Sequence, residues 1–254
     1  MELYGLLGKT LKHSFSEKYF GKKFEEEGID AEYRLFEFAD VPDLHAFAEE
    51  HPSLKGLNIT IPFKRKVISQ LDDVSNIVKM TGSVNVIKVN RKNGNVKLIG
   101  FNTDVSGFER SLEPLIRKRN NLRALILGTG GAAHSVAFVL RKMGIYFCFV
   151  TRSPNKVEMI GYSWVKPEII DDYRLIVNTS PIGMFPDTDA CPDIPYESLG
   201  PDHILFDLIY NPPETCFLKK GKERGAIIQN GQEMLEVQAE ESWKIWKNKS
   251  GFLL

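Results

Sequence analysis

The chain has 254 residues, and its 33 lysine and arginine side chains balance 33 aspartate and glutamate side chains, so the formal net charge is zero. This balance argues against a general nucleic-acid binder, and the longest apolar runs fall far short of the roughly 18 residues of a membrane-spanning helix. The first residues lack the pattern of a signal peptide, and three scattered cysteines form neither a disulfide framework nor a CxxC metal site. We therefore expect a cytoplasmic protein without a metal, whose partners include neither nucleic acid nor a membrane.

In the first hundred residues, short runs rich in β-branched residues alternate with longer segments of helical periodicity, the pattern of βαβ units around a parallel sheet. The dipeptide Asn93-Gly94 is a strong hairpin signal. We expect strands at 3–7, 32–38, 56–60, 84–89 and 96–100, and helices at 16–27, 41–50 and 64–80, the last with a break near Asp72.

The second half of the chain starts with a predicted helix at 104–118 and continues the alternation. We expect strands at 123–128, 146–150, 175–178, 204–206 and 226–228, and helices at 131–143 and 232–248. Segment 181–201 is rich in proline, glycine and aspartate and is predicted to be one long loop, a kind of loop that is often functional in a compact domain.

A glycine-rich turn lies between the predicted strand at 123–128 and the predicted helix at 131–143. It reads Gly128, Thr129, Gly130, Gly131, Ala132, Ala133 and matches the G-x-G-x-x-G/A pattern of dinucleotide-binding sites. In such a turn Gly130 lets the backbone approach a pyrophosphate, and the helix N-terminus offers N–H groups to the phosphates. The alternative is an ordinary strand-turn-helix connection whose glycines serve packing.

The end of the next predicted strand indicates which dinucleotide binds. NAD sites place an acidic residue about 20 residues after the first glycine, but this chain has Thr151, Arg152, Ser153 and Lys156 there, and no acidic residue before Glu158. A guanidinium group with nearby hydroxyl groups suits the 2′-phosphate of NADP. The alternative is an ordinary surface arginine at a strand end.

Polar side chains also lie at the ends of the predicted strands of the first half. They are Asn58, Thr60 and Lys64 at the C-terminal end of one strand, and Asn85 and Asp104 at similar junctions. In open α/β sheets, ligands bind at the carboxyl ends of the strands. Each residue also has a structural interpretation: the asparagines as turn residues, Asp104 as a helix cap and Lys64 as a solvated surface charge.

Taken together, these segments resemble the shikimate dehydrogenase family, and the resemblance runs through almost the whole chain. The family's N-V-T-x-P-x-K and G-x-N-T-D-x-x-G stretches appear at 58–64, with Ile59 for valine, and at 100–107. The glycine loop and the basic turn follow, and three later motifs of the family appear in order at 178–184, 207–215 and 231–238. Such an ordered series is far more specific than any one motif.

The N-terminal motif departs from the family pattern. The family reads S-x-S-P-x-x-H, whereas this chain keeps Ser14 and Ser16 but has Glu17 and Phe20 at the proline and histidine positions. The resemblance implies that both serines bind the carboxylate of the substrate. Ser14 and Glu17 also fit the S-x-x-E pattern of a capping box at a helix start.

The resemblance implies a reversible reduction of 3-dehydroshikimate to shikimate with NADPH. Lys64 would donate a proton to the carbonyl oxygen in reduction and accept it in oxidation, and Asp104 would orient Lys64. The implied substrate-binding residues are Ser14, Ser16, Thr60, Asn85, Asp104, Tyr210 and Gln238. To the glycine loop and the basic turn, the resemblance adds Asn76, Leu208 and Gly231 around the cofactor.

The expected α/β architecture has two domains around a cleft. Residues 1–103 would form a substrate-binding domain with a mainly parallel sheet, against which residues 231–254 pack back, and residues 104–230 a Rossmann-type NADP-binding domain. Two alternatives stay open: a related enzyme that prefers quinate or uses NAD, and a non-catalytic ligand-sensing homologue. The sequence does not decide between a monomer and a homodimer.

Overall fold

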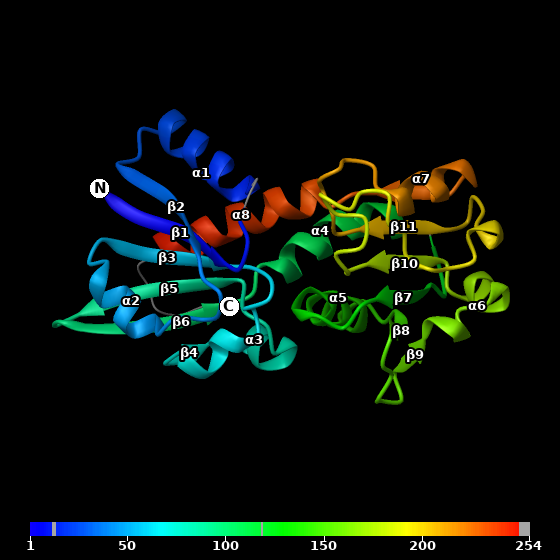
Figure 1. Ribbon diagram of the computed structural model, residues 1–254, viewed down its shortest axis with the longest axis horizontal. Helices are drawn as coiled ribbons and strands as arrows, with labels where there is room; N and C mark the ends of the chain where they lie inside the picture. Colours follow the sequence, from blue (N-terminus) through cyan, green and yellow to red (C-terminus); the bar gives the residue numbers. More distant parts are fainter. Residues whose placement is uncertain (12–13, 118, 249–254) are drawn as a thin grey trace. The chain divides into compact units, whose positions relative to one another are not determined.

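The computed structural model describes residues 1–11, 14–117 and 119–248, so the predicted end of a helix at Lys118 and the segment 249–254 lie outside the described residues. The chain forms two compact units (Figure 1), one of residues 1–103 with residues 239 onward, the other of residues 104–238. Each unit contains a six-stranded sheet with helices. The predicted α/β class is therefore confirmed.

The sheet of the first unit has the strand order β2-β1-β3-β5-β6-β4. Its strands are β1 (Glu2–Gly8), β2 (Ala31–Glu37), β3 (Leu54–Ile59), β4 (Asp73–Val74), β5 (Val86–Lys92) and β6 (Asn95–Phe101). Pairing is parallel except where β5 lies antiparallel to β3 and to β6. Asn93 and Gly94 join β5 to β6 with positive φ angles of 53° and 80°, as a tight hairpin turn requires.

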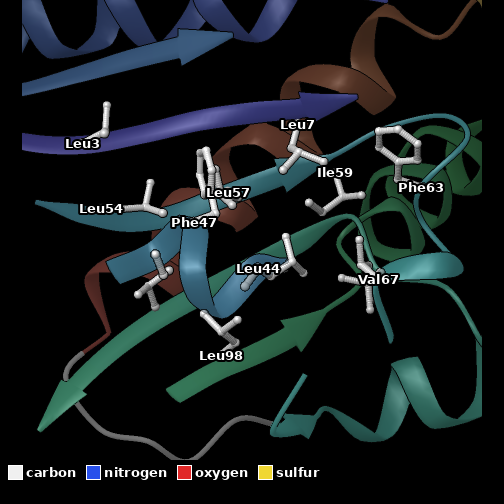
Figure 2. Packing of buried hydrophobic residues seen from close by; sticks show 14 of the residues in the cluster. Leu3, Leu7, Leu44, Phe47, Leu54, Leu57, Ile59, Phe63, Val67 and Leu98 are labelled. Atoms are coloured by element: carbon white, nitrogen blue, oxygen red, sulfur yellow. The ribbon is translucent and has the colours of Figure 1, made fainter. Parts of the chain in front are cut away.

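Helices cover both faces of this sheet because successive side chains of a strand point to opposite faces. The helical segments of this unit are α1 (Phe15–Glu26), α2 (Leu44–Glu50), the 3-10 turn η1 (Lys66–Gln70), α3 (Asn76–Thr81) and the second part of α8 (Gln232–Lys247). Leu3 and Leu7 of β1 belong to a core with α2, η1 and α3, in which Figure 2 shows Leu44 and Phe47 of α2 over the sheet. Tyr4 and Leu6 pack on the other face with α1 and α8.

The sheet of the second unit is entirely parallel, with the order β12-β11-β10-β7-β8-β9. The strands are β7 (Arg123–Leu127), β8 (Tyr146–Thr151), β9 (Met159–Gly161), β10 (Leu175–Asn178), β11 (Ile204–Asp207) and β12 (Ile227–Gln229). If β7 to β12 are numbered 1 to 6 in chain order, the strands follow one another across the sheet, starting from β9, as 3-2-1-4-5-6. This is the strand order of a Rossmann fold. The order reverses between β7 and β10, the point at which such sheets bind ligands.

Helices pack on both faces of the second sheet as well. They are α4 (Asp104–Ile116), α5 (Gly131–Lys142), α6 (Pro167–Asp172) and α7 (Cys216–Glu223), with 3-10 turns η2 (Tyr162–Trp164) and η3 (Tyr196–Ser198). Ile170 of α6 and Phe217 of α7 share a core with strand side chains of one face. On the other, Phe108 of α4 lies with its ring 5.0 Å from that of Phe206.

The predicted helical segment at 64–80 is confirmed in its break near Asp72 but not in the length of its two helical parts. The segment instead folds as a turn, η1, the two-residue strand β4 and the short helix α3. Backbone pairing with β6 replaces helical hydrogen bonds here, because Asp72 N–H donates to Leu98 O at 3.0 Å and Ser75 N–H donates to Gly100 O at 2.9 Å. The short elements β9, α6 and α7 were also not predicted, whereas segment 181–201 is a loop interrupted only by η3.

Candidate functional site

Thr60 and Lys64 follow β3, and Asn85 precedes β5, at one end of the first sheet. Ile59 N–H donates to Asn85 O at 2.8 Å, and Val84 N–H donates to Lys64 O at 2.7 Å. Two segments at least twenty residues apart in the sequence are thus joined by backbone hydrogen bonds. Lys64 is half-buried and Asn85 is buried.

The two N-terminal serines stand at the start of α1. Ser14 is the N-cap residue, but its side chain makes no capping hydrogen bond, so the capping-box interpretation is wrong. Its Oγ is buried and has no hydrogen-bond partner among the described residues. Ser16 is buried too.

The two departures from the family pattern have different surroundings. Glu17 is exposed on α1. Phe20 is fully buried, and its ring stacks on that of Tyr33 with centroids 4.8 Å apart and an interplanar angle of 15°. An aromatic hydrocarbon ring therefore fills the position where the family pattern has histidine.

Asn85 is held by Thr103, a residue that the sequence analysis did not single out. Thr103 N–H donates to Asn85 Oδ1 at 2.7 Å, and Asn85 Nδ2 donates to Thr103 Oγ1 at 2.9 Å. Thr103 directly precedes Asp104 in the G-x-N-T-D motif, and that position is the signal that could have indicated its role. Asp104 itself is buried and is the first residue of α4, where the helix dipole favours a carboxylate.

The glycine loop lies at the point where the second sheet reverses its strand order. Gly128 has a φ of +114°, and a Cβ atom there would come within 2.9 Å of Thr179 Oγ1, after β10. Thr179 Oγ1 donates to Leu127 O at 2.8 Å, so the loops after β7 and β10 lie side by side. Gly130 is the N-cap residue of the twelve-residue helix α5, and a Cβ atom there would meet nothing within 4 Å. The helix end is therefore open to a phosphate group.

The remaining residues of the glycine loop and those of the basic turn follow the same strand ends. Thr129 precedes Gly130, and Gly131 and Ala132 are the first two residues of α5. Thr151 ends β8 and accepts a hydrogen bond at 3.4 Å from Ser153 N–H.

The charged side chains of the basic turn are exposed. Arg152 and Lys156 form no ion pair within the described part of the chain, and Glu158 pairs with Arg141 at 3.8 Å. Among the described residues, this end of β8 therefore presents positive charge with no acidic partner, which suits a phosphate better than a ribose hydroxyl group.

Leu208 and Gly231 are brought into contact. A Cβ atom at Gly231 would lie 2.2 Å from Leu208 O, so only glycine fits there, and Gly231 N–H donates to Ile209 O at 3.0 Å. Tyr210 follows in the same loop and is partly buried, and Gln238 is buried in α8.

The candidate residues are divided between the two units. Ser14, Ser16, Thr60, Lys64, Asn76 and Asn85 belong to the first unit, and the other candidates belong to the second. Asn76 is the exposed first residue of α3. Lys64 and Asp104 stand in different units, so their pairing stays a prediction.

The described residues contain no group of three or more histidine, cysteine, aspartate or glutamate side chains that could hold a metal ion. Within the same part of the chain, no helix combines the length and the apolar character needed to cross a lipid bilayer.

Comparison with known proteins agrees with these observations. Residues 6–87 match the family model of the shikimate dehydrogenase substrate binding domain. The shikimate dehydrogenase (NADP(+)) of Caldicellulosiruptor saccharolyticus is 37% identical over 257 residues, covering 95% of this chain and 90% of that protein.

Solved structures give the same result. Shikimate 5-dehydrogenase of Thermus thermophilus, in complex with NADP(H) and shikimate, has a TM-score of 0.82 and 30% identity, with 97% of this chain and 94% of that chain covered. Quinate dehydrogenase of Corynebacterium glutamicum, in complex with NAD, has a TM-score of 0.83 and 25% identity over 97% and 93% of the two chains. The sequence, the fold and these comparisons together show that the chain belongs to the shikimate dehydrogenase family.

Proposed function

We propose that the protein is an NADP-dependent shikimate dehydrogenase, an oxidoreductase that acts on a CH–OH group and reversibly reduces 3-dehydroshikimate to shikimate. The buried hydroxyl group of Ser14, which has no partner among the described residues, carries the substrate assignment. A buried hydroxyl group without a hydrogen bond costs about 1–3 kcal/mol, and a substrate carboxylate beside the N-terminus of α1 would provide that bond. Family membership supports the same conclusion.

The second unit fits the dinucleotide. A Cβ atom at Gly130 would meet nothing within 4 Å, so there is free space beside the N-terminus of α5. A pyrophosphate can use this space to reach the N–H groups of the helix end. Arg152 and Lys156, both exposed and without ion pairs in the described residues, suit a 2′-phosphate. We therefore assign NADP as the cofactor, with Gly128 to Ala132 at the pyrophosphate and Thr151 to Ser153 with Lys156 at the 2′-phosphate. Asn76, Leu208 and Gly231 complete this set.

NADPH, when bound, supplies the hydride that reduces the carbonyl carbon. Lys64 gives a proton to the carbonyl oxygen, which becomes the hydroxyl group, and takes it back in the oxidation of shikimate. Asp104 orients the Lys64 ammonium group and accepts a hydrogen bond from the same hydroxyl group. The ammonium group also stabilises the negative charge that develops on the oxygen.

The substrate ring is held by hydroxyl, amide and carboxylate groups, which suit a carboxylate and several hydroxyl groups. We assign this role to Ser14, Ser16, Thr60, Asn85, Asp104, Tyr210 and Gln238. We further infer that most substrate-binding residues belong to the first unit and most cofactor-binding residues to the second. The enzyme would then act as a cytoplasmic monomer or homodimer in the shikimate pathway, which leads to chorismate and the aromatic amino acids.

Initial rates with shikimate or quinate, each with NADP⁺ or NAD⁺, test this proposal through the absorbance of the reduced nicotinamide. Rapid turnover with shikimate and NADP⁺ alone is the expected result. A preference for quinate would contradict the substrate assignment, and a preference for NAD⁺ would contradict the role of Arg152. Binding of both ligands without turnover would show a ligand-sensing protein.

A further inference from the structure

A buried row of hydrogen bonds runs beneath Asn85 in the first unit. Tyr33 of β2 donates from its hydroxyl group to Asn58 Oδ1 at 2.8 Å. Asn58 Nδ2 donates to Ser242 Oγ of α8 at 3.1 Å, and Ser242 Oγ lies 3.3 Å from Thr103 Oγ1. These four side chains are between 0% and 7% exposed, so water does not compete for their bonds.

The row has a defined direction. Tyr33 donates to Oδ1 of Asn58, so the Nδ2 end of that amide faces Ser242 and the backbone oxygen of Asn85, 3.3 Å away. Ser242 Oγ accepts from Asn58 Nδ2 and lies within hydrogen-bond distance of Thr103 Oγ1, a pair in which either hydroxyl group can donate.

Thr103 connects this row of hydrogen bonds to the side-chain amide of Asn85. Thr103 N–H donates to Oδ1 of Asn85 and Asn85 Nδ2 donates to Thr103 Oγ1, so Thr103 fixes which end of the Asn85 amide accepts and which end donates.

We propose that Asn58 is a positioning residue for substrate binding, which fixes the place and the donor orientation of Asn85 through two routes, its direct bond to the Asn85 backbone and the Ser242–Thr103 pair. This inference rests on the proposed function, because it assigns Asn85 to the substrate. Asn58 itself contacts neither the reacting atoms nor the cofactor in this assignment. Tyr33 sets which end of the Asn58 amide donates.

The substitution Asn58→Asp tests this role because it keeps the shape of the side chain and replaces its amide donor with a carboxyl group that can ionise. A neutral carboxyl group still donates one hydrogen bond, whereas a carboxylate only accepts. Burial raises the pKa of a carboxyl group, so the variant changes from donor to acceptor as the pH rises. A positioning role then predicts near wild-type behaviour at low pH and a defect at high pH.

Other titratable groups on the surrounding elements are present in both proteins. They are Tyr33 on β2, Glu17 on α1, Lys88 on β5 and Glu240 on α8. Lys88 donates to Ile245 O at 2.9 Å, and Glu240 pairs with Lys23 at 3.0 Å. The ratio of variant to wild type at each pH therefore isolates the introduced carboxyl group.

The experiment measures KM for shikimate, KM for NADP⁺ and kcat between pH 5.5 and 9 for the wild type and Asn58→Asp. We expect KM for shikimate at high pH to rise about 10-fold, to approach the wild-type value as the pH falls, and KM for NADP⁺ to stay unchanged. Tyr33→Phe and Ser242→Ala, which remove single hydroxyl groups, should each raise KM for shikimate less. Tyr4→Phe is the matched control, since Tyr4 is also buried, on β1, but its hydroxyl group donates to Glu2.

Unchanged KM for shikimate in folded Asn58→Asp at high pH would overturn the inference. If that variant does not fold, unchanged values in both hydroxyl variants would overturn it equally. A pH-independent rise of both KM values would show a merely structural role. A wild-type protein without activity on shikimate would instead refute the proposed function, and the inference would fall with it.

Discussion

Thr215 donates a 2.6 Å hydrogen bond from its hydroxyl group to Oδ2 of Asp207, a carboxyl group at the end of β11 with no exposed surface. The other oxygen, Oδ1, accepts from Ile209 N–H at 3.0 Å and from Asn178 Nδ2 at 3.1 Å. Burial raises the pKa of Asp207 from 3.8 to about 6, against the opposing effect of these hydrogen bonds. The folded protein therefore holds a proton here that the unfolded chain releases near pH 4.

Stability is consequently linked to pH through Asp207. The pKa of Asp207 is higher in the folded protein than in the unfolded chain. Its contribution to the free energy of unfolding is therefore complete below about pH 4 and is lost as the pH rises through about 6. The loss is of the order of 3 kcal/mol. We predict that Asp207→Asn, which can keep the same hydrogen-bond partners, removes this component. Urea unfolding between pH 4 and 7 measures the free energy of unfolding of the wild type, of Asp207→Asn and of the control Asp202→Asn, whose side chain is exposed. If the free energy of unfolding had the same pH dependence in all three proteins, the prediction would be contradicted.

Gly130→Ala separates cofactor binding from folding. A methyl group at this position meets no protein atom within 4 Å, so the free energy of unfolding should be nearly unchanged. The methyl group would stand where the pyrophosphate approaches the backbone, and KM for NADP⁺ should rise about 10-fold or more. Gly21→Ala on α1 is the matched control, because a Cβ atom there also meets nothing. Equal KM values in wild type and Gly130→Ala would exclude this position for the pyrophosphate.

Arg152→Gln tests the choice between NADP and NAD. Loss of a charge-assisted hydrogen-bond pair to the 2′-phosphate should lower kcat/KM with NADP⁺ about 10- to 100-fold. NAD⁺ lacks this phosphate and serves as the internal control, with little expected change. An equal fall of kcat/KM with NADP⁺ and with NAD⁺ would contradict the assignment of Arg152 to the 2′-phosphate.

Much of the fold is predictable because the local signals are strong. Asn93-Gly94 indicates a hairpin without any tertiary information, and buried strands such as β7 and β10 are short apolar runs between turns. The glycine pattern also predicts the turn at Gly128, since only glycine suits a φ of +114° so near Thr179.

In segment 64–80 the break near Asp72 was predictable, but the strand β4 and the shortness of the helical parts were not, because tertiary pairing overrides the local pattern. Val67 and Val78 become buried as an amphipathic helix would require, but through a 3-10 turn and a short helix on either side of β4. Similarly, Asn58 and Ser242 lie 184 residues apart, and no local pattern reports their hydrogen bond. The motifs thus identify candidate residues, whereas the buried side chains that hold them emerge only from the fold.

The central claim is that this chain catalyses the reaction and that Lys64 is its acid and base. Lys64→Ala should lower kcat for shikimate oxidation about 100-fold or more, while calorimetry shows that shikimate and NADP⁺ still bind. Lys66→Ala is the control, because this exposed lysine two residues further pairs with Asp40 at 2.8 Å. A kcat in Lys64→Ala equal to that of the wild type would contradict the account.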